Sequence, residues 1–238
     1  MTRHKVHHVL SIAFALSLGA LFVAKFAGPQ ILRLYVQSGI GNGQKLPIFY
    51  TSPEREAIKA EVDETYLAEL KFYKFPDFNV SLPKDLKAVA GRITKTYYKK
   101  RPWRSGKKAY LLYEAPDFFV NLFNPVIKFG IKDDQEFLDR TMYARVDTIN
   151  NLNDAFFTIM KSIFVPDMGD QQNFKIIKFS IEDKKGFISY DLSEQGNYFD
   201  CNLFDGDRNF YKVYIKDNNR SLDVNKMMTI VSTLRKAE

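Results

Sequence analysis

A basic segment with interleaved aromatic residues is the part of this sequence best suited to bind an anionic partner. Residues 92–108 read RITKTYYKKRPWRSGKK and contain eight Lys and Arg residues and no acid. The chain carries a net charge of +7, yet outside this segment it has 27 basic and 28 acidic residues. The excess positive charge is therefore a property of one segment.

This basic segment suits anionic lipid head groups, an acidic protein face or nucleic acid. Tyr97, Tyr98 and Trp103 lie among the cations, as stacking residues or interfacial anchors do. The alternative is a solvated hairpin tip whose charges keep the chain soluble. Nucleic acid is the least favoured partner, because a domain outside the cytoplasm seldom meets it. The residues predicted to contact a protein partner or lipid are Lys99, Lys100, Arg101, Trp103, Arg104, Lys107 and Lys108.

The distribution of histidine and cysteine argues against most catalytic chemistry. All three histidines, His4, His7 and His8, precede residue 9, so Ser-His-Asp and Cys-His systems lack their imidazole. The single cysteine, Cys201, alternates with Phe199 and Leu203 and is interpreted as a buried hydrophobe. Carboxylate chemistry stays open, but no pair of acids stands out. We expect no catalytic residue, cofactor or metal site.

Two polar segments resemble ligand loops but lack their defining residues. The glycine-rich residues 39–43 have neither the preceding strand nor the GK[ST] ending of a nucleotide site, which favours a linker. Residues 205–209 offer the D-x-D-x-N start of a calcium loop. The position that requires a glutamate is Lys216, so we predict a hairpin turn.

Residues 9–28, VLSIAFALSLGALFVAKFAG, contain one charge, Lys25. As a helix they would span roughly 30 Å, enough to cross a bilayer core. We predict a single-pass transmembrane anchor behind a short basic tail at residues 1–8. A cleaved signal peptide is the alternative, although Phe22 spoils the small-residue pattern before Ala24.

The orientation of this anchor follows from its flanking charges. A basic tail ahead of an N-terminal anchor usually stays in the cytoplasm. The positive charges before the apolar run, Arg3 and Lys5, are nearly balanced by Lys25 and Arg33 at its far end. We therefore expect a protein of the cell inner membrane with its domain in the periplasm or otherwise extracytoplasmic.

Residues 29–65 are interpreted as a linker or neck. Residues 31–36 can extend the anchor helix beyond Pro29, and a short surface helix is predicted around Pro53–Val62. The folded domain is predicted to span residues 66–238.

The domain begins with strands and a hairpin. Alternation predicts a strand at 78–82, and residues 89–98 and 109–113 predict a long hairpin around the basic segment. The apolar run 118–123 is typical of a central strand. A helix is predicted within 133–146.

A second helix is predicted from Asp147 to Pro166. Its apolar stripe, expected to pack on the sheet, is Ile149, Leu152, Phe156, Ile159 and Ile163.

The last third of the domain alternates with period two. Four strands centred on Phe179, Tyr190, Cys201 and Val213 form a predicted antiparallel meander. A closing helix with Asp223 as its N-cap carries Val224, Met227, Val231 and Leu234. The fold class is therefore α+β, an antiparallel β-sheet packed by helices.

The order of these elements resembles the PsbP-like α/β sandwich group over about residues 72–234. The resemblance rests on FPDFNVSLP at 75–83, similar to an opening strand that ends in Leu-Pro, and on FYKVY at 210–214 followed by the closing helix. No diagnostic motif supports it, and the anchor and the basic insertion depart from the group. Members of the group mostly bind and stabilise larger assemblies, so the resemblance implies an accessory role.

Together these observations predict a membrane-anchored, non-catalytic accessory or assembly subunit of a larger membrane protein complex. The alternative is an envelope protein that binds a lipid or another small ligand between sheet and helix. The 21 Phe and 13 Tyr residues permit such a pocket, although a packed core needs the same residues.

Overall fold

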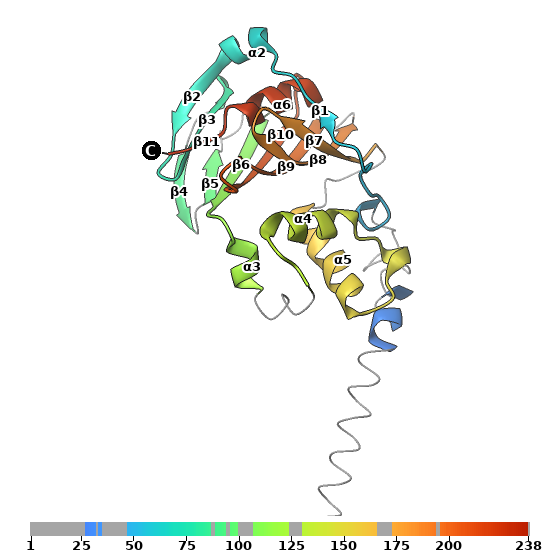
Figure 1. Ribbon diagram of the computed structural model, residues 1–238. Coiled ribbons are helices and arrows are strands. Elements are labelled where there is room, and N and C mark those ends of the chain that lie inside the picture. The colour runs from blue at the N-terminus through green and yellow to red at the C-terminus, as the bar shows by residue number, and fades with distance from the viewer. Residues whose placement is uncertain are drawn as a thin grey trace, which may run out of the picture.

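The computed structural model describes residues 27–31, 33–34, 47–86, 89–93, 96–99, 107–123, 130–165, 173–193 and 196–237. These residues form an α+β domain in which helices pack on antiparallel-rich sheets, which confirms the predicted class (Figure 1). Within this part of the chain, none of the helices has both the length and the apolar content to cross a bilayer. All but the last two residues of the predicted anchor lie outside it.

A sheet of eight strands forms the middle layer. Its spatial order is β1 (Ile58–Lys59), β7 (Lys175–Ile181), β8 (Lys184–Ser193), β9 (Gly196–Phe204), β10 (Phe210–Asp217), β6 (Lys107–Glu114), β5 (Thr96–Lys99) and β4 (Val89–Ile93). Only the β1–β7 pair is parallel. The predicted meander is confirmed as β7 to β10, because Ile188 pairs with Cys201, and Cys201 pairs with Val213.

One face of this sheet is covered by a smaller sheet and a helix. The smaller sheet has the order β11 (Arg235–Lys236), β3 (Phe78–Pro83) and β2 (Leu70–Lys74), and α6 (Val224–Ser232) lies beside it. Phe179, Cys201 and Val213 pack here with Met227 and Val231. The Asp223 carboxylate accepts a hydrogen bond from Lys226 N, which confirms the predicted N-cap.

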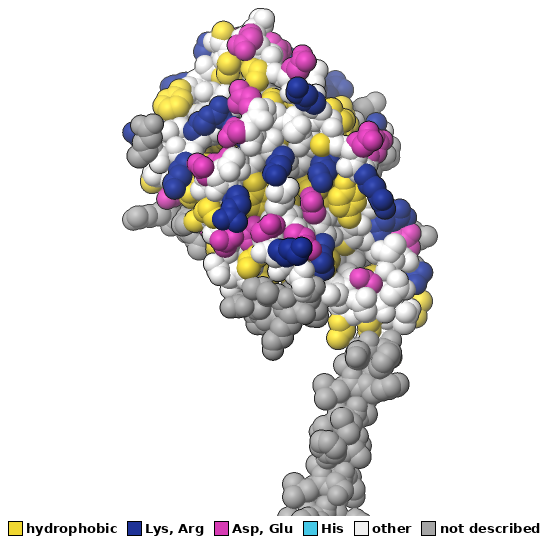
Figure 2. Space-filling model, viewed as in Figure 1, with side chains coloured by type: hydrophobic (Ala, Val, Ile, Leu, Met, Phe, Trp, Pro, Cys, Tyr) yellow, Lys and Arg dark blue, Asp and Glu magenta, His cyan; other side chains and the backbone are white. Residues whose placement is uncertain are grey.

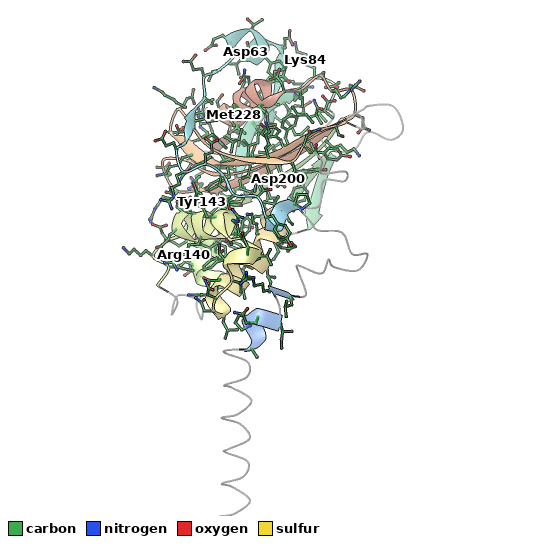
Figure 3. The ribbon with its side chains drawn as sticks, turned by 90° about the vertical axis from the view of Figure 1, so that its right-hand side faces the viewer. Asp63, Lys84, Arg140, Tyr143, Asp200 and Met228 are labelled. Atoms are coloured by element: carbon green, nitrogen blue, oxygen red, sulfur yellow. The ribbon has the colours of Figure 1, made fainter. Side chains whose placement is uncertain are left out.

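The opposite face is covered by helices α3 (Phe118–Leu122), α4 (Asp134–Tyr143) and α5 (Leu152–Phe164). The core here is strongly aromatic, with Phe119, Phe137 and Phe164 against Phe187 and Phe210. Both faces of the eight-stranded sheet are therefore buried. Figure 3 shows Asp200 of β9 at the level of the sheet, between Met228 of α6 and Tyr143 of the helical layer.

The prediction of a central strand at 118–123 is wrong, because these residues form α3. The Asp134 carboxylate, from the next helix, accepts a hydrogen bond from Val120 N at 2.7 Å and stabilises the start of α3. A short apolar run fits a strand and a buried helix equally, so the local sequence favoured neither.

Residues 47–63 belong to the folded domain rather than to a neck, and the helix predicted at Pro53–Val62 is wrong. The 3-10 helix η1 (Pro47–Phe49) buries Ile48 and Phe49 in the helical core. Strand β1 then extends the large sheet, and α2 (Glu64–Glu69) follows. A helix with few apolar residues gains little from packing on the domain, whereas this extended segment pairs its backbone with β7.

Candidate functional site

The described residues of the basic segment lie in β4, β5 and β6, at one side of the large sheet. Strand β5 pairs antiparallel with β6, and Lys99 pairs with Ala109, which confirms the predicted hairpin for these two strands. Residues 89–93 do not continue its first arm but form a separate strand, β4, that pairs antiparallel with β5. Residues 94–95 separate β5 from β4, so a further strand was missed. Lys107 and Lys108 open β6 and pair with Asp217 and Lys216. Lys100, Arg101, Trp103 and Arg104 lie outside the described residues.

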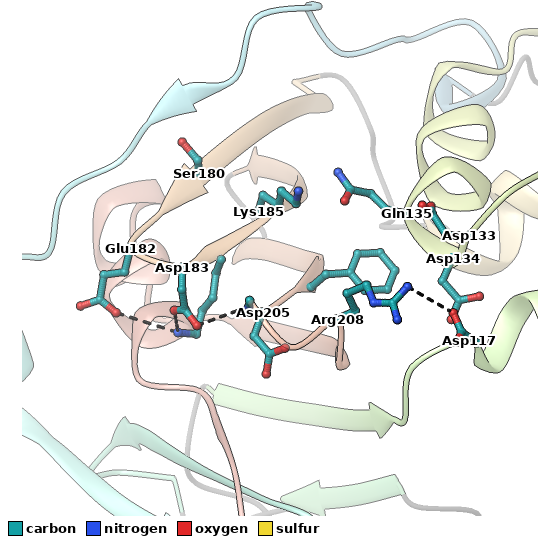
Figure 4. Close-up of a pocket in the computed structure, with 13 residues that line it drawn as sticks. Asp117, Asp133, Asp134, Gln135, Ser180, Glu182, Asp183, Lys185, Asp205 and Arg208 are labelled. Carbon is teal, nitrogen blue, oxygen red and sulfur yellow. Dashed lines mark hydrogen bonds and ion pairs between the residues drawn. The ribbon is translucent and has the colours of Figure 1, made fainter.

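A polar cavity of about 300 Å³ lies at the other end of β6 and β10 (Figure 4). It is bounded by the start of α3, the start of α4, the β7–β8 turn and the β9–β10 turn. Three lining residues, Asp117, Glu182 and Arg208, have left-handed backbone conformations with φ of 62°, 50° and 64°. The lining holds the acids Asp117, Asp133, Asp134, Glu182, Asp183 and Asp205, and the bases Lys184, Lys185 and Arg208.

Most of these carboxylates serve the protein's own backbone and side chains. Asp133 accepts a hydrogen bond from Glu136 N at 2.8 Å and caps α4. Asp205 accepts from Asn209 N at 2.9 Å and from the Tyr211 hydroxyl at 2.8 Å, which confirms the predicted hairpin turn. Among the described residues, no three His, Cys, Asp or Glu side chains are placed to hold a metal ion.

Titration within the cavity follows burial and pairing. Burial raises the pKa of Asp134, against the hydrogen bond from Val120 N. Burial also acts to raise the pKa of Asp183, but the hydrogen bond and charge of Lys184, 2.7 Å away, outweigh it and lower that pKa. These groups stabilise the turns and helix ends around the cavity.

A buried polar cluster fastens α5 to the sheet. The Lys212 ammonium lies 2.9 Å from the Asp200 carboxylate and donates to the Phe164 carbonyl at 2.7 Å. The Asn202 amide donates to the same carbonyl at 3.1 Å and to Asp200 at 2.9 Å. Burial raises the pKa of Asp200, although Lys212 and Asn202 act to lower it. We call Asp200, Asn202 and Lys212 the polar tether.

Lys161 is a second buried cation, on the inner side of α5. Its ammonium donates to the carbonyls of Thr51 at 2.5 Å and Ala144 at 2.9 Å. Burial lowers its pKa to about 7. Lys161 lies outside the predicted apolar stripe, a position that favours solvent, yet its side chain is buried and links α5 to the backbone of residues 51 and 144.

The apolar stripe predicted to pack α5 on the sheet points outward instead. Leu152, Ile159 and Ile163 are 46%, 48% and 62% exposed, and Phe156 is half-buried. The buried side of the helix carries Phe157, Met160 and Phe164. The helix also starts later than predicted, with Asn151 as its N-cap, and Ile149 is buried ahead of it.

Sequence reasoning missed the polar tether and the inward position of Lys161. Asp200, Asn202 and Lys212 alternate with core residues, which is also the pattern of a sheet with one solvated face. The same face of the sheet as the polar tether also carries three phenylalanines, Phe187, Phe204 and Phe210. These residues were the available signal that this face is covered.

No protein-family model matches this chain, and comparison with curated proteins finds no relative. The resemblance to the PsbP-like group therefore stays a prediction from residues 75–83 and 210–214.

Proposed function

We propose that this protein is a single-pass, membrane-anchored accessory or assembly subunit of a larger membrane protein complex, and that it is not a catalyst. Residues 9–28 are its anchor in the cell inner membrane, and the folded domain is extracytoplasmic. Its partners are other protein subunits and anionic lipid.

The observation that carries this proposal is the way the domain holds the segment that follows the anchor. Between η1 and α2 the backbone is fixed by several elements in succession. The Lys161 ammonium donates to Thr51 O, the Tyr143 hydroxyl donates to Glu54 O at 2.8 Å, and Ala60 N donates to Ser180 O at 2.8 Å. The domain thus holds residues 51–60, which follow the anchor and its linker in the sequence, in a fixed conformation.

The residues next to the anchor also lie against the domain. Residues 27–31 and 33–34 are helical and Pro29 is buried. The hydrogen bond from Arg145 lowers the pKa of Asp147, and the charge of Arg33 lowers it further, so Arg33 lies within electrostatic reach of the segment that leads into α5. A fixed mount of this kind suits a subunit that presents one surface to a membrane-embedded partner.

The basic hairpin is the proposed contact with that partner. Lys99, Lys100, Arg101, Trp103, Arg104, Lys107 and Lys108 concentrate the positive charge on strands β5 and β6 and their connection. An acidic subunit face or anionic head groups complement this charge, and the association should weaken as salt rises.

The proposal is tested by mild detergent extraction of the full chain from its native membrane, followed by size analysis. We expect migration with a complex of reproducible size. Reversing Lys99, Lys100, Arg101 and Arg104 to Glu should release the chain, whereas the matched reversal of the exposed Lys71, Lys74, Lys84 and Lys236 should not.

Two results would contradict this function. A wild-type chain that migrates as a monomer with extractable lipid would favour the lipid-binding alternative. Recovery of the chain in the soluble fraction, without detergent, would contradict the proposal that residues 9–28 anchor it in the membrane.

A further inference from the structure

The outward face of α5 has no charged residue. Leu152, Phe156, Ile159 and Ile163 follow one another at spacings of 4, 3 and 4 residues, and all but the half-buried Phe156 are exposed. The other exposed residue between Leu152 and Ile163 is Ser162. A helix on the surface of a soluble domain normally shows charged and polar residues on this side. A continuous exposed apolar stripe marks a surface that something covers.

The helix cannot hide this stripe by turning, because its other side is held firmly. Phe157 and Phe164 pack edge-to-face on Phe137, with ring centroids 5.8 and 6.0 Å apart. Lys161 is bonded on the same side, and the polar tether holds the carbonyl of Phe164. The outward stripe is therefore a fixed feature of the folded domain.

The stripe lies at the end of the domain where the predicted anchor arrives. Helical residues 27–31 and 33–34 lie beside α5 in Figure 1, and Figure 2 shows hydrophobic side chains at this end of the molecule. Ile31 and Leu34 are 62% and 65% exposed, and Leu122 of α3 is 58% exposed. Residues 27 and 28, the last two of the proposed anchor, are described at this end of the domain, so a bilayer that holds the anchor lies next to it.

We infer that α5 is an interfacial helix whose outward stripe inserts into the head-group and acyl boundary of the membrane that holds residues 9–28. This inference rests on the proposed anchor. A lipid surface is the occupant that the position of the stripe favours, because the chain itself brings the bilayer to this face. Apolar side chains without charge gain free energy from such burial and need no matching partner surface.

The test uses the full chain in vesicles of phosphatidylcholine with a minor fraction of phosphatidylglycerol. A nitroxide spin label is attached to Ile159→Cys or Ile163→Cys, and to Asn225→Cys as the control. Asn225 is exposed on α6, across the sheet from α5. The native Cys201 is buried, and burial raises its pKa well above the ordinary value, so it should not react.

Collision rates with oxygen, which enters lipid, and with a polar nickel chelate, which stays in water, are then compared. We expect oxygen collisions to exceed nickel collisions at residues 159 and 163, and the reverse at residue 225. Excess nickel collisions at 159 and 163 would place the stripe in water. Few collisions with both reagents would place it against protein, either another subunit or a second copy. Each of these results overturns the lipid contact.

A flotation step separates this inference from the function on which it rests. Vesicles are washed with alkaline carbonate before the measurement, and the chain should float with them. Loss of the chain at this step would contradict the anchor itself. Retention of the chain with a water-exposed stripe would contradict only the interfacial role of α5.

Discussion

Helices α5 and α6 cover opposite faces of the same sheet, and each has an apolar stripe that is evident in its sequence. In α6 the stripe Met227 and Val231 is buried in the core, as predicted. In α5 the stripe Leu152, Ile159 and Ile163 faces outward. Periodicity thus identifies an amphipathic helix, but the side that meets the core depends on what else the helix carries.

The difference between the helices lies in their second faces. The remaining positions of α6 include Asn225 and Lys226, which suit solvent. In α5 the remaining positions include Phe157, Met160 and Phe164, so the helix has two apolar stripes. Lys161 lies on the same side of α5 as these three residues, and a lysine normally indicates a face in contact with water. Its ammonium instead donates to two backbone carbonyls inside the protein.

The two helices also differ in how they are fastened to the sheet. Helix α6 relies on apolar contacts, its Asp223 cap and the Thr229 hydroxyl, which accepts a hydrogen bond from Asp63 N at 2.9 Å. Helix α5 is held by aromatic packing and also by two cations, the buried Lys161 and the partly buried Lys212. Substitutions at these two lysines test most directly whether polar contacts hold α5 to the sheet in addition to apolar packing.

The largest effect is expected for Lys212→Met. This change leaves the Asp200 carboxylate buried without its cation, which costs about 3 to 5 kcal/mol of unfolding free energy. The measurement is denaturant unfolding in detergent solution. The double variant Asp200→Asn, Lys212→Met should recover most of the loss, because no buried charge remains. A single variant as stable as the double variant would show that the ion pair does not fasten α5.

Because burial lowers the pKa of Lys161, we expect the free energy of unfolding to rise with pH. Its pKa is about 7 in the folded protein against an ordinary 10.5, so between these values the unfolded chain holds a proton that the folded chain has released. Stability should rise with pH in this window, by up to about 1.4 kcal/mol per pH unit. Unfolding of the wild type and of Lys161→Met is compared between about pH 7 and 9. Parallel curves would contradict burial of this ammonium.

Charge reversal in the basic hairpin should affect association more than stability. Changing Lys99, Lys100, Arg101 and Arg104 to Glu should cost at most about 1 kcal/mol each, because the sequence predicts these charges to lie at the surface, where charges contribute little. Association with the membrane or partner should weaken, and Trp103→Ala should weaken it further. Cosedimentation with native membranes at low and high salt measures this. Unchanged association would leave the hairpin as a solvated surface.

Local rules were sufficient for the parts of the fold whose neighbours follow one another along the chain. Alternation and short turns predicted β7 to β10, and Asp223 and Asp133 cap α6 and α4 in the ordinary way. Long-range contacts decided the rest. The smaller sheet joins Asn79 to Arg235, and α3 depends on Asp134 from the next helix, so neither was accessible to a local reading.

The candidate site was predictable to a smaller extent. The hairpin of the basic segment followed from its turn residues and flanking alternation. Burial of Asp200 and Lys212 could not be predicted from the local sequence, because it depends on helices that cover the second face of the sheet. Periodicity predicted the stripe of α5 but placed it on the wrong side, because Phe157, Met160 and Phe164 form a second apolar face of the same helix.

The outward orientation of α5 is tested most directly by a pair of polar substitutions two residues apart. Phe157 is 5% exposed and Ile159 is 48% exposed. In denaturant unfolding in one detergent, Phe157→Asn should lose about 3 kcal/mol or more, because it empties a core site and buries an amide. Ile159→Asn should stay within about 0.5 kcal/mol of the wild type. A larger loss for Ile159→Asn than for Phe157→Asn would contradict the account.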